Sequence, residues 1–351
     1  MSTLLTAAWL LQTAAVAPQS ALAPGGPGAA RIAELWWIML AIGTLVILLV
    51  IALLGYALFR RRGPTGPFPE QQARDESTGR GREESGRRES ERRGTRWIII
   101  GGIAFPAVVL TVLFVFTLRT LDALSVRSDA MRRDELVIEV TGLQWWWRVR
   151  YIDPVPGRMF ETANELHIPV GRRVLVRLRA TDVIHSFWVP GLQGKLDMIP
   201  GKTNVTWLAA DRPGVWRGQC AEYCGLQHAK MALVVVAEPP AEFERWLERQ
   251  RAPAAMPGDS AALVAQRAFL ASGCTPCHTV RGTDALGELG PDLTHLASRR
   301  TLAAATLPNT PGHLAGWITN PQAIKPGSFM PRVPLSAEQL ALVLQYLGSL
   351  R

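Results

Sequence analysis

Cysteine is scarce in this chain: only four occur among 351 residues, as two close pairs, Cys220 with Cys224 and Cys274 with Cys277. Domains that depend on disulfides carry many more cysteines for their length, so a disulfide scaffold is excluded. Two tight pairs in so long a chain point instead to metal or cofactor chemistry.

Charge is also limited and unevenly spread. Charged residues make up 19% of the chain and apolar residues 48%, which is too apolar for a disordered protein and too charged for one wholly inside a bilayer. The net charge of +9 would favour nucleic acid or anionic membranes. Residues 60–96 alone hold eleven arginines against seven acidic residues, so the excess is partly local. We expect soluble domains joined to membrane segments, and no nucleic-acid partner.

Two segments, Leu35–Phe59 and Trp97–Leu118, lack charged residues altogether. About 20 helical residues cross the hydrocarbon core of a bilayer, so both are long enough to span it. The sequence predicts a hairpin of transmembrane helices at 35–59 and 97–118, with membrane lipid around both. Pro106 should kink the second helix without breaking its span.

Residues 60–96, between these helices, are rich in Arg, Glu, Ser and Gly, which predicts a disordered loop. Its arginines place the loop in the cytoplasm by the positive-inside rule, and everything after Leu118 on the opposite side. The apolar run Leu4–Ala17 followed by Ala21-Leu-Ala23 resembles a cleavable signal peptide over residues 1–23, although its start lacks Lys or Arg.

From residue 135 to 240 the chain turns to short alternating stretches broken by Gly and Pro, which predicts an all-β sandwich or Greek-key barrel. Soft and imidazole donors gather near its end, and together they favour copper or zinc, with the thioether favouring copper. These donors are His185, Cys220, Cys224, His228 and Met231. A disulfide or a structural zinc site remains an alternative on spacing alone.

These motifs resemble subunit II of haem-copper cytochrome c oxidases. The resemblance is carried by Cys220-x-Glu222-x-Cys224-x3-His228-x2-Met231, by His185-Ser-Phe-Trp, by Lys195-Leu-Asp-Met-Ile-Pro-Gly and by Gly142-Leu-Gln-Trp-Trp-Trp. It implies a cupredoxin-like domain with a binuclear CuA centre. The implied ligands are two bridging thiolates, two terminal imidazoles, a weak thioether and one carbonyl, from Cys220, Cys224, His185, His228, Met231 and Glu222.

The resemblance also implies roles outside the copper ligands. The Glu222 side chain would face a Mg or Mn site shared with the catalytic subunit, and Trp145 would be the point of electron entry. Trp146 and Trp147 are better read as strand aromatics that pack on the sheet. Family members often carry a Glu shortly before the Pro of the second helix, but Ile98–Gly102 occupies that stretch here. Proton uptake through this chain is therefore in doubt.

A helix and a Pro/Ala-rich linker over 241–258 lead to a last domain at 259–351. Its Cys274-x-x-Cys277-His278 motif is the pattern that binds haem c covalently through both thiols, with the histidine as axial ligand. A thioredoxin-like redox pair is the alternative. Met330 is the only methionine after His278 and is the expected sixth ligand, with His295 and His313 as rivals.

The last domain resembles a class I cytochrome c, in which a proline carbonyl, here that of Pro291, orients the proximal histidine. Such a module is fused to subunit II in caa3-type oxidases. The whole chain is therefore expected to be a multi-domain membrane protein: a two-helix transmembrane hairpin, an all-β cupredoxin-like domain and an all-α class I cytochrome c domain.

The resemblance implies the electron-entry subunit of a caa3-type oxidase, passing electrons from haem c to CuA and on to haem in a catalytic subunit that reduces oxygen to water. Implied partners are oxidase subunit I, other oxidase subunits and a donor, either cytochrome c or a cytochrome bc complex. The implied location is the bacterial inner membrane, with both cofactor domains on the periplasmic or outer side. Rival interpretations are a nitrous oxide reductase module, and a structural quinol-oxidase subunit, which should lack copper ligands.

Overall fold

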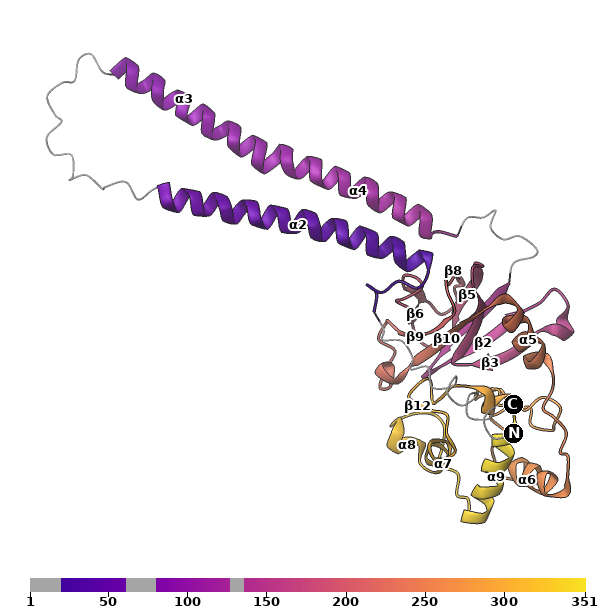
Figure 1. Cartoon of the computed structure of the whole chain (residues 1–351). Coiled ribbons are helices and arrows are strands. Elements are labelled where there is room, and N and C mark those ends of the chain that lie inside the picture. Colours follow the sequence, from indigo (N-terminus) through magenta and orange to yellow (C-terminus); the bar gives the residue numbers. More distant parts are fainter. Residues whose placement is uncertain (1–19, 61–79, 127–135) are drawn as a thin grey trace, which may run out of the picture. The chain divides into compact units, whose positions relative to one another are not determined.

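The computed structural model describes residues 20–60, 80–126 and 136–351 (Figure 1). The chain divides into two compact units: Ile32–Ala123, and a larger unit formed by Met1–Arg31 with Leu124–Arg351. The smaller unit is helical, and the larger one holds the β-domain and the C-terminal helical domain.

Two long helical segments make up the smaller unit. Helix α2 covers Pro27–Arg60, and α3 (Arg80–Ile99), the π-helical turn η1 (Ile100–Ala104) and α4 (Phe105–Leu124) follow one another directly. The most apolar windows of Pro27–Arg60 and Glu91–Leu124 have mean hydropathies of 3.0 and 2.7, and neither is buried in the protein. A core helix of a soluble domain would be buried, so these two segments have the length and apolar exposure of membrane spans.

Pro106 accounts for the π-helical turn. A proline inside a helix lacks an N–H and its ring crowds the carbonyl four residues earlier. The preceding turn widens, and the Phe105 amide donates to the carbonyl of Ile100, five residues back. The second span thus passes Pro106 with a local change of helix type.

The loop prediction for 60–96 is corrected in part. Residues 61–79 lie outside the described residues, but residues 80–96 form most of α3 rather than a disordered segment. Arg and Glu are good helix formers, and Glu89 and Arg93 pair at a spacing of one turn, with 4.0 Å between their charged atoms. Local helix propensity outweighs the lack of apolar residues here.

The β-domain is a sandwich of two five-stranded sheets with orders β3-β2-β1-β5-β8 and β4-β10-β9-β6-β7. Alternating apolar residues such as Ile138, Val140, Val149 and Val176 face the core between the sheets. The strands are β1 (Val137–Leu143), β2 (Trp146–Ile152), β3 (Phe160–Ala163), β4 (Glu165–Pro169), β5 (Val174–Ala180), β6 (His185–Trp188), β7 (Leu196–Met198), β8 (Asn204–Leu208), β9 (Gly214–Cys220) and β10 (Ala232–Glu238).

The residues that follow the predicted signal peptide pack on this domain. The Gly25 amide donates to the carbonyl of Gly191 at 2.7 Å, and the Asp211 amide donates to the carbonyl of Gly25 at 2.9 Å. Gly25 fits because a Cβ there would lie 2.5 Å from the Trp216 ring. Residues 1–19 lie outside the described residues, so the signal peptide itself stays a prediction.

The C-terminal domain packs helix α6 (Ser260–Leu270) against α9 (Ala337–Ser349) around Phe269, Val343 and Tyr346. Asp259 and Ser336 cap these helices, and Ser336 with Gln339 forms a reciprocal capping box. The remaining elements are η5 (Leu296–Ser298), β11 (Thr301–Leu302), β12 (Leu307–Pro308), α7 (Pro311–Thr319) and α8 (Pro321–Ile324).

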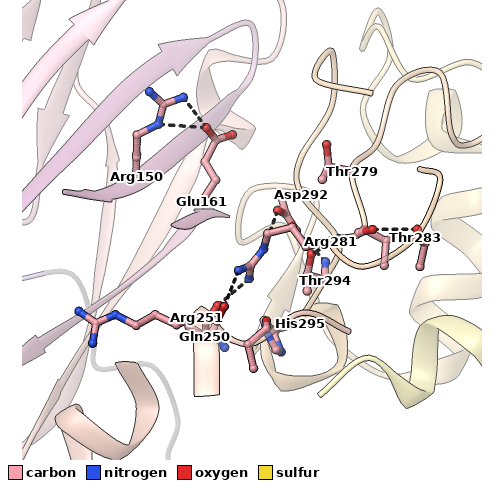
Figure 2. Close-up of polar contacts among 12 residues, drawn as sticks. Arg150, Glu161, Gln250, Arg251, Thr279, Arg281, Thr283, Asp292, Thr294 and His295 are labelled. Atoms are coloured by element: carbon pink, nitrogen blue, oxygen red, sulfur yellow. Dashed lines mark hydrogen bonds and ion pairs between the residues drawn. The ribbon is translucent and has the colours of Figure 1, made fainter. Parts of the chain in front are cut away.

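The start of the connection between the two domains is held by hydrogen bonds. Helix α5 (Pro240–Arg251) leads into it, and the Ala254 amide donates to the carbonyl of Arg281 at 2.9 Å. Figure 2 shows the Arg281 guanidinium reaching back to the main-chain carbonyls of Gln250 and Arg251, at 2.6 and 3.1 Å. The expected linker therefore docks against the cytochrome-like domain instead of crossing solvent freely.

Candidate metal and haem centres

The predicted copper ligands meet at one end of the β-sandwich. His185 opens strand β6, Cys220 closes the neighbouring strand β9, and the loop from 221 to 231 returns the chain into β10. Main-chain hydrogen bonds close this loop, with the Cys220 amide donating to the carbonyl of Met231 at 2.9 Å. His185, Cys220, Cys224 and Met231 are all buried.

The donor atoms form two adjoining groups. The sulfur atoms of Cys220 and Cys224 are 3.8 Å apart, far beyond the bonding distance of about 2.05 Å in a disulfide. The Cys220 sulfur lies 3.9 Å from Nδ1 of His185. The Cys224 sulfur lies 3.7 Å from Nδ1 of His228 and 3.8 Å from the sulfur of Met231. The Glu222 carbonyl lies 3.1 Å from the Cys220 sulfur. Each of the six predicted residues therefore places one donor atom in this cluster.

The two thiols influence each other's ionisation. A hydrogen bond from the Cys224 thiol, aided by His185, lowers the pKa of Cys220 to about 3. The pKa of Cys224 is raised, because the hydrogen bond with Cys220 holds its proton and ionisation would place a second negative charge beside the first. Two thiolates at this distance need a cation between them, and soft donors suit copper.

Residues outside the ligand set orient it. Nε2 of His185 lies 2.8 Å from Oδ1 of Asp182, which leaves Nδ1 free to face Cys220. The Gln144 side-chain amide and the Trp145 indole both donate to the Cys224 carbonyl, at 2.8 and 2.9 Å. Only glycine fits at position 142 beside the His185 ring, because a Cβ there would lie 2.8 Å from the ring.

The other predicted residues of this region have different surroundings. Trp147 is fully buried and its ring packs edge-on against Phe187, which fits a packing role. The Trp146 ring lies 5.6 Å from the Arg148 guanidinium. The Glu222 side chain is exposed, and Trp145 is buried at the boundary with the C-terminal domain.

In the C-terminal domain, Cys274, Cys277 and His278 share one turn: the amides of Cys277 and His278 both donate to the carbonyl of Cys274. Nδ1 of His278 lies 2.7 Å from the carbonyl of Pro291, as the resemblance implies. Burial lowers the pKa of His278, which favours the neutral imidazole, the form that could ligate a metal. Gly290 lies so close that a Cβ would be 2.6 Å from the imidazole.

Met330 lies in the loop after α8 and packs against the apolar core of this domain. The rival ligands have other partners. Both ring nitrogens of the buried His295 face carbonyls, those of Arg351 at 2.7 Å and Ala252 at 3.0 Å. His313 is exposed at the start of α7, where its Nδ1 lies 2.8 Å from the Thr310 hydroxyl.

The two centres are linked by side chains at the domain boundary. The ring of Phe329, next to Met330, lies parallel to the Trp145 indole, with centroids 6.0 Å apart and planes at 8°. Trp145 in turn donates to the Cys224 carbonyl. Contacts therefore run from the segment carrying Met330 to the loop carrying the thiols.

Sequence reasoning missed three of the residues that shape these sites. Asp182 stands three residues before His185, a spacing that could have signalled a hydrogen-bond partner. Gln144 belongs to the Gly-Leu-Gln-Trp motif but no role was assigned to it. Lys325 contacts Trp145 from 180 residues away, and no local pattern reveals that contact.

Comparisons with known proteins match the two domains that carry these candidate sites. The family described as "Cytochrome C oxidase subunit II, periplasmic domain" matches residues 136–238, and "Cytochrome c" matches 264–351. A cytochrome c oxidase subunit 2 from Alkalihalophilus pseudofirmus is 40% identical over 215 residues, which is 61% of each chain. One from Bacillus sp. (strain PS3) is 30% identical over 271 residues, 73% of each chain. The match thus spans under two thirds of the first relative.

Among solved structures, the periplasmic domain of subunit II of cytochrome oxidase (CoxB) from Bradyrhizobium japonicum is 34% identical. That match covers 33% of this chain and 93% of that one, with a TM-score of 0.31. The two family matches together cover the β-domain and the C-terminal helical domain. The chain belongs to the cytochrome c oxidase subunit 2 family, with a cytochrome c domain fused at its C-terminal end.

Proposed function

We propose that this chain is the electron-entry subunit of a caa3-type cytochrome c oxidase. It would accept electrons at a covalent haem c, pass them to a binuclear CuA centre and deliver them to haem in a catalytic subunit, where oxygen is reduced to water. When bound, the copper pair and the haem iron each take up and release one electron. The single observation that carries the proposal is the contact of Phe329 with Trp145 between the two sites.

The donor set supports two copper ions over one zinc. Each thiol has its own neighbours: Cys220 has His185, and Cys224 has His228 and Met231. Separations of 3.7 to 3.9 Å suit atoms that share a metal at bonds of about 2.0–2.3 Å. A single tetrahedral zinc would use four donors and no thioether, whereas sulfur-rich sets with methionine are typical of copper.

The protein's own residues keep this site dry and rigid. His185 and Met231 are fully buried, and hydrogen bonds hold the His185 ring and the Cys224 carbonyl in place. A pocket fixed by strands and a closed loop changes little when the charge of the bound group changes. Little reorganisation is what rapid electron transfer requires.

The C-terminal site suits a covalent haem. Cys274 and Cys277 lie on one turn beside His278, and the Pro291 carbonyl orients that histidine. Leu286 and Leu289 are largely exposed on either side of Gly287, whose backbone packs against Pro276. These exposed apolar side chains beside the cysteine turn could pack against the apolar ring of a bound haem.

The proposal includes a second metal site, the partners of the chain and its location. The exposed Glu222 side chain would help hold Mg or Mn at the boundary with subunit I, and other oxidase subunits would complete the complex. Cytochrome c or a cytochrome bc complex would be the donor. The two helices would anchor the chain in the bacterial inner membrane, with both cofactor domains on the periplasmic or outer side.

Metal and haem content of the purified chain tests the proposal. We expect about two copper atoms and one covalent haem per chain, since two thiols are shared and the haem motif occurs once. The optical spectrum should show thiolate-to-copper absorption together with a c-type haem. Zinc in place of copper, or a copper-to-haem ratio near one, would contradict it.

A further inference from the structure

Lys325 is an unusual residue in this chain. Of the four lysines, the other three are exposed, whereas Lys325 is only 4% exposed. It belongs to the segment 322–330, which we call the docking loop, and which ends at Met330. No salt bridge joins it to a carboxylate in the part of the chain described. Burial lowers its pKa to about 7.

The Lys325 ammonium crosses the boundary between the two cofactor domains. Its Nζ donates to the carbonyl of Trp145 at 2.7 Å and lies 3.4 Å from the carbonyl of Ala303. A buried ammonium costs stability unless its donors are used, and an apolar side chain would be cheaper to bury. Unlike an apolar side chain, the ammonium makes a directional hydrogen bond, which fixes the Trp145 main chain against the docking loop.

Two side chains of the 221–231 loop, which carries predicted copper ligands, also donate hydrogen bonds to the docking loop. The Gln227 side-chain amide donates to the carbonyl of Pro326 at 2.6 Å, and the Lys230 amine donates to the carbonyl of Ile324. Residues 324, 325 and 326 therefore each share a hydrogen bond with the copper domain. Gln227 and Lys230 stand on either side of His228, so these bonds reach the ligand loop itself.

The docking loop is also stiffened from within. The Gln322 side chain donates to the carbonyls of Ser328 and Met330, at 2.8 and 3.1 Å, and accepts from the Gly327 amide at 2.8 Å. Because the loop is stiff, fixing Lys325 also restricts the positions of Phe329, which stacks on Trp145, and of Met330.

We propose that Lys325 is a positioning residue for electron transfer between the domains: it locks the docking loop onto Trp145 so that the haem site faces the copper site in one arrangement. This inference rests on the proposed function. One electron passes from ferrous haem to the oxidised copper pair, and no proton or bond is exchanged.

The test uses the full-length chain loaded with both cofactors and compares Lys325→Met with the matched control Lys202→Met. Methionine keeps the length of the lysine stem but cannot donate to the Trp145 carbonyl. Lys202 is an exposed lysine in the turn before β8. Haem-to-copper transfer is followed optically after rapid photoreduction of the haem. The enhancement of copper spin relaxation by ferric haem, which falls steeply with separation, reports docking independently.

We expect Lys325→Met to keep the optical spectra of both centres. Transfer should slow about tenfold, the order expected for losing one charge-assisted hydrogen bond from the docked state. The relaxation enhancement should fall, and amide hydrogen exchange in the docking loop should rise. Lys202→Met should match the parent in all three measurements. Should Lys325→Met fail to fold, Lys230→Met serves instead, because that side chain is exposed, and a smaller change of the same sign is expected.

Unchanged transfer and unchanged relaxation in Lys325→Met, with both centres loaded, would overturn this inference and leave the proposed function standing. For Lys230→Met, used alone, unchanged values would have the same meaning. A parent chain that lacks copper, haem or transfer between them would instead overturn the proposed function, and this inference with it.

Discussion

The copper and haem sites are built in different ways. All six residues of the proposed copper site lie from 185 to 231, and hydrogen bonds within that domain hold them. The proposed haem ligands are divided: His278 is held by Pro291 of its own domain, whereas Met330 ends a loop that the copper domain holds through Lys325 and Gln227. The copper site should therefore be self-contained, while the methionine side of the haem is coupled to docking.

The largest effect should come from breaking the copper site alone. We expect Cys220→Ser to abolish thiolate-to-copper absorption, because it removes a sulfur shared by both halves of the site. The haem spectrum should stay unchanged, since its ligands lie in another domain. Optical spectra and copper content of the purified variant check this. Loss of the covalent haem in Cys220→Ser would show that the two sites are not independent.

A smaller, local effect should follow at the haem. Met330→Ala should lose the weak far-red band that marks a methionine-to-iron bond, while His278 keeps the fifth position and the copper spectrum persists. His313→Ala is the matched control, because that imidazole is exposed and contacts Thr310. Survival of the band in Met330→Ala would contradict the ligand assignment.

The smallest effect concerns a boundary contact that uses neither cofactor. His167 is buried between Glu165 and Glu238, each 3.0 Å from a ring nitrogen, and the Arg300 amide of the C-terminal domain donates to Glu165 at 2.9 Å. Burial opposes a charge on His167, but the hydrogen bonds to both carboxylates outweigh it and raise its pKa.

The sign of the pH dependence follows from that shift. A raised pKa stabilises the folded chain fully below the unfolded value of about 6.5, and this contribution is lost as pH rises through the higher folded value. We expect the thermal midpoint of the parent to fall over that range, and the fall to be shallower in His167→Gln. Equal slopes in parent and variant would show that His167 does not titrate there.

Sequence reasoning reached most of the fold, the cluster of residues at the proposed copper site and the cysteine–histidine turn, because these leave local patterns. Uncharged runs mark the two spans, alternation marks the strands, and Cys-x-Glu-x-Cys and Cys-x-x-Cys-His each place their donors within one turn or loop. It failed on α3, where helix propensity outweighed polar composition. It also missed Asp182, although its three-residue spacing from His185 was visible, and Lys325, whose contact with Trp145 spans 180 residues and has no local signature. Pro/Ala-rich residues 252–258 looked like a free tether, yet Arg281 and the Ala254 amide hold the start of that segment.

The order of reduction in the intact chain tests the central claim most directly. Stopped-flow mixing with the donor, followed at haem and copper wavelengths, should show haem reduced first and copper second. The second phase should be first order and independent of protein concentration, because both sites belong to one chain and the docking loop holds them against each other. Copper reduced before haem, or a second phase that scales with protein concentration, would contradict the account.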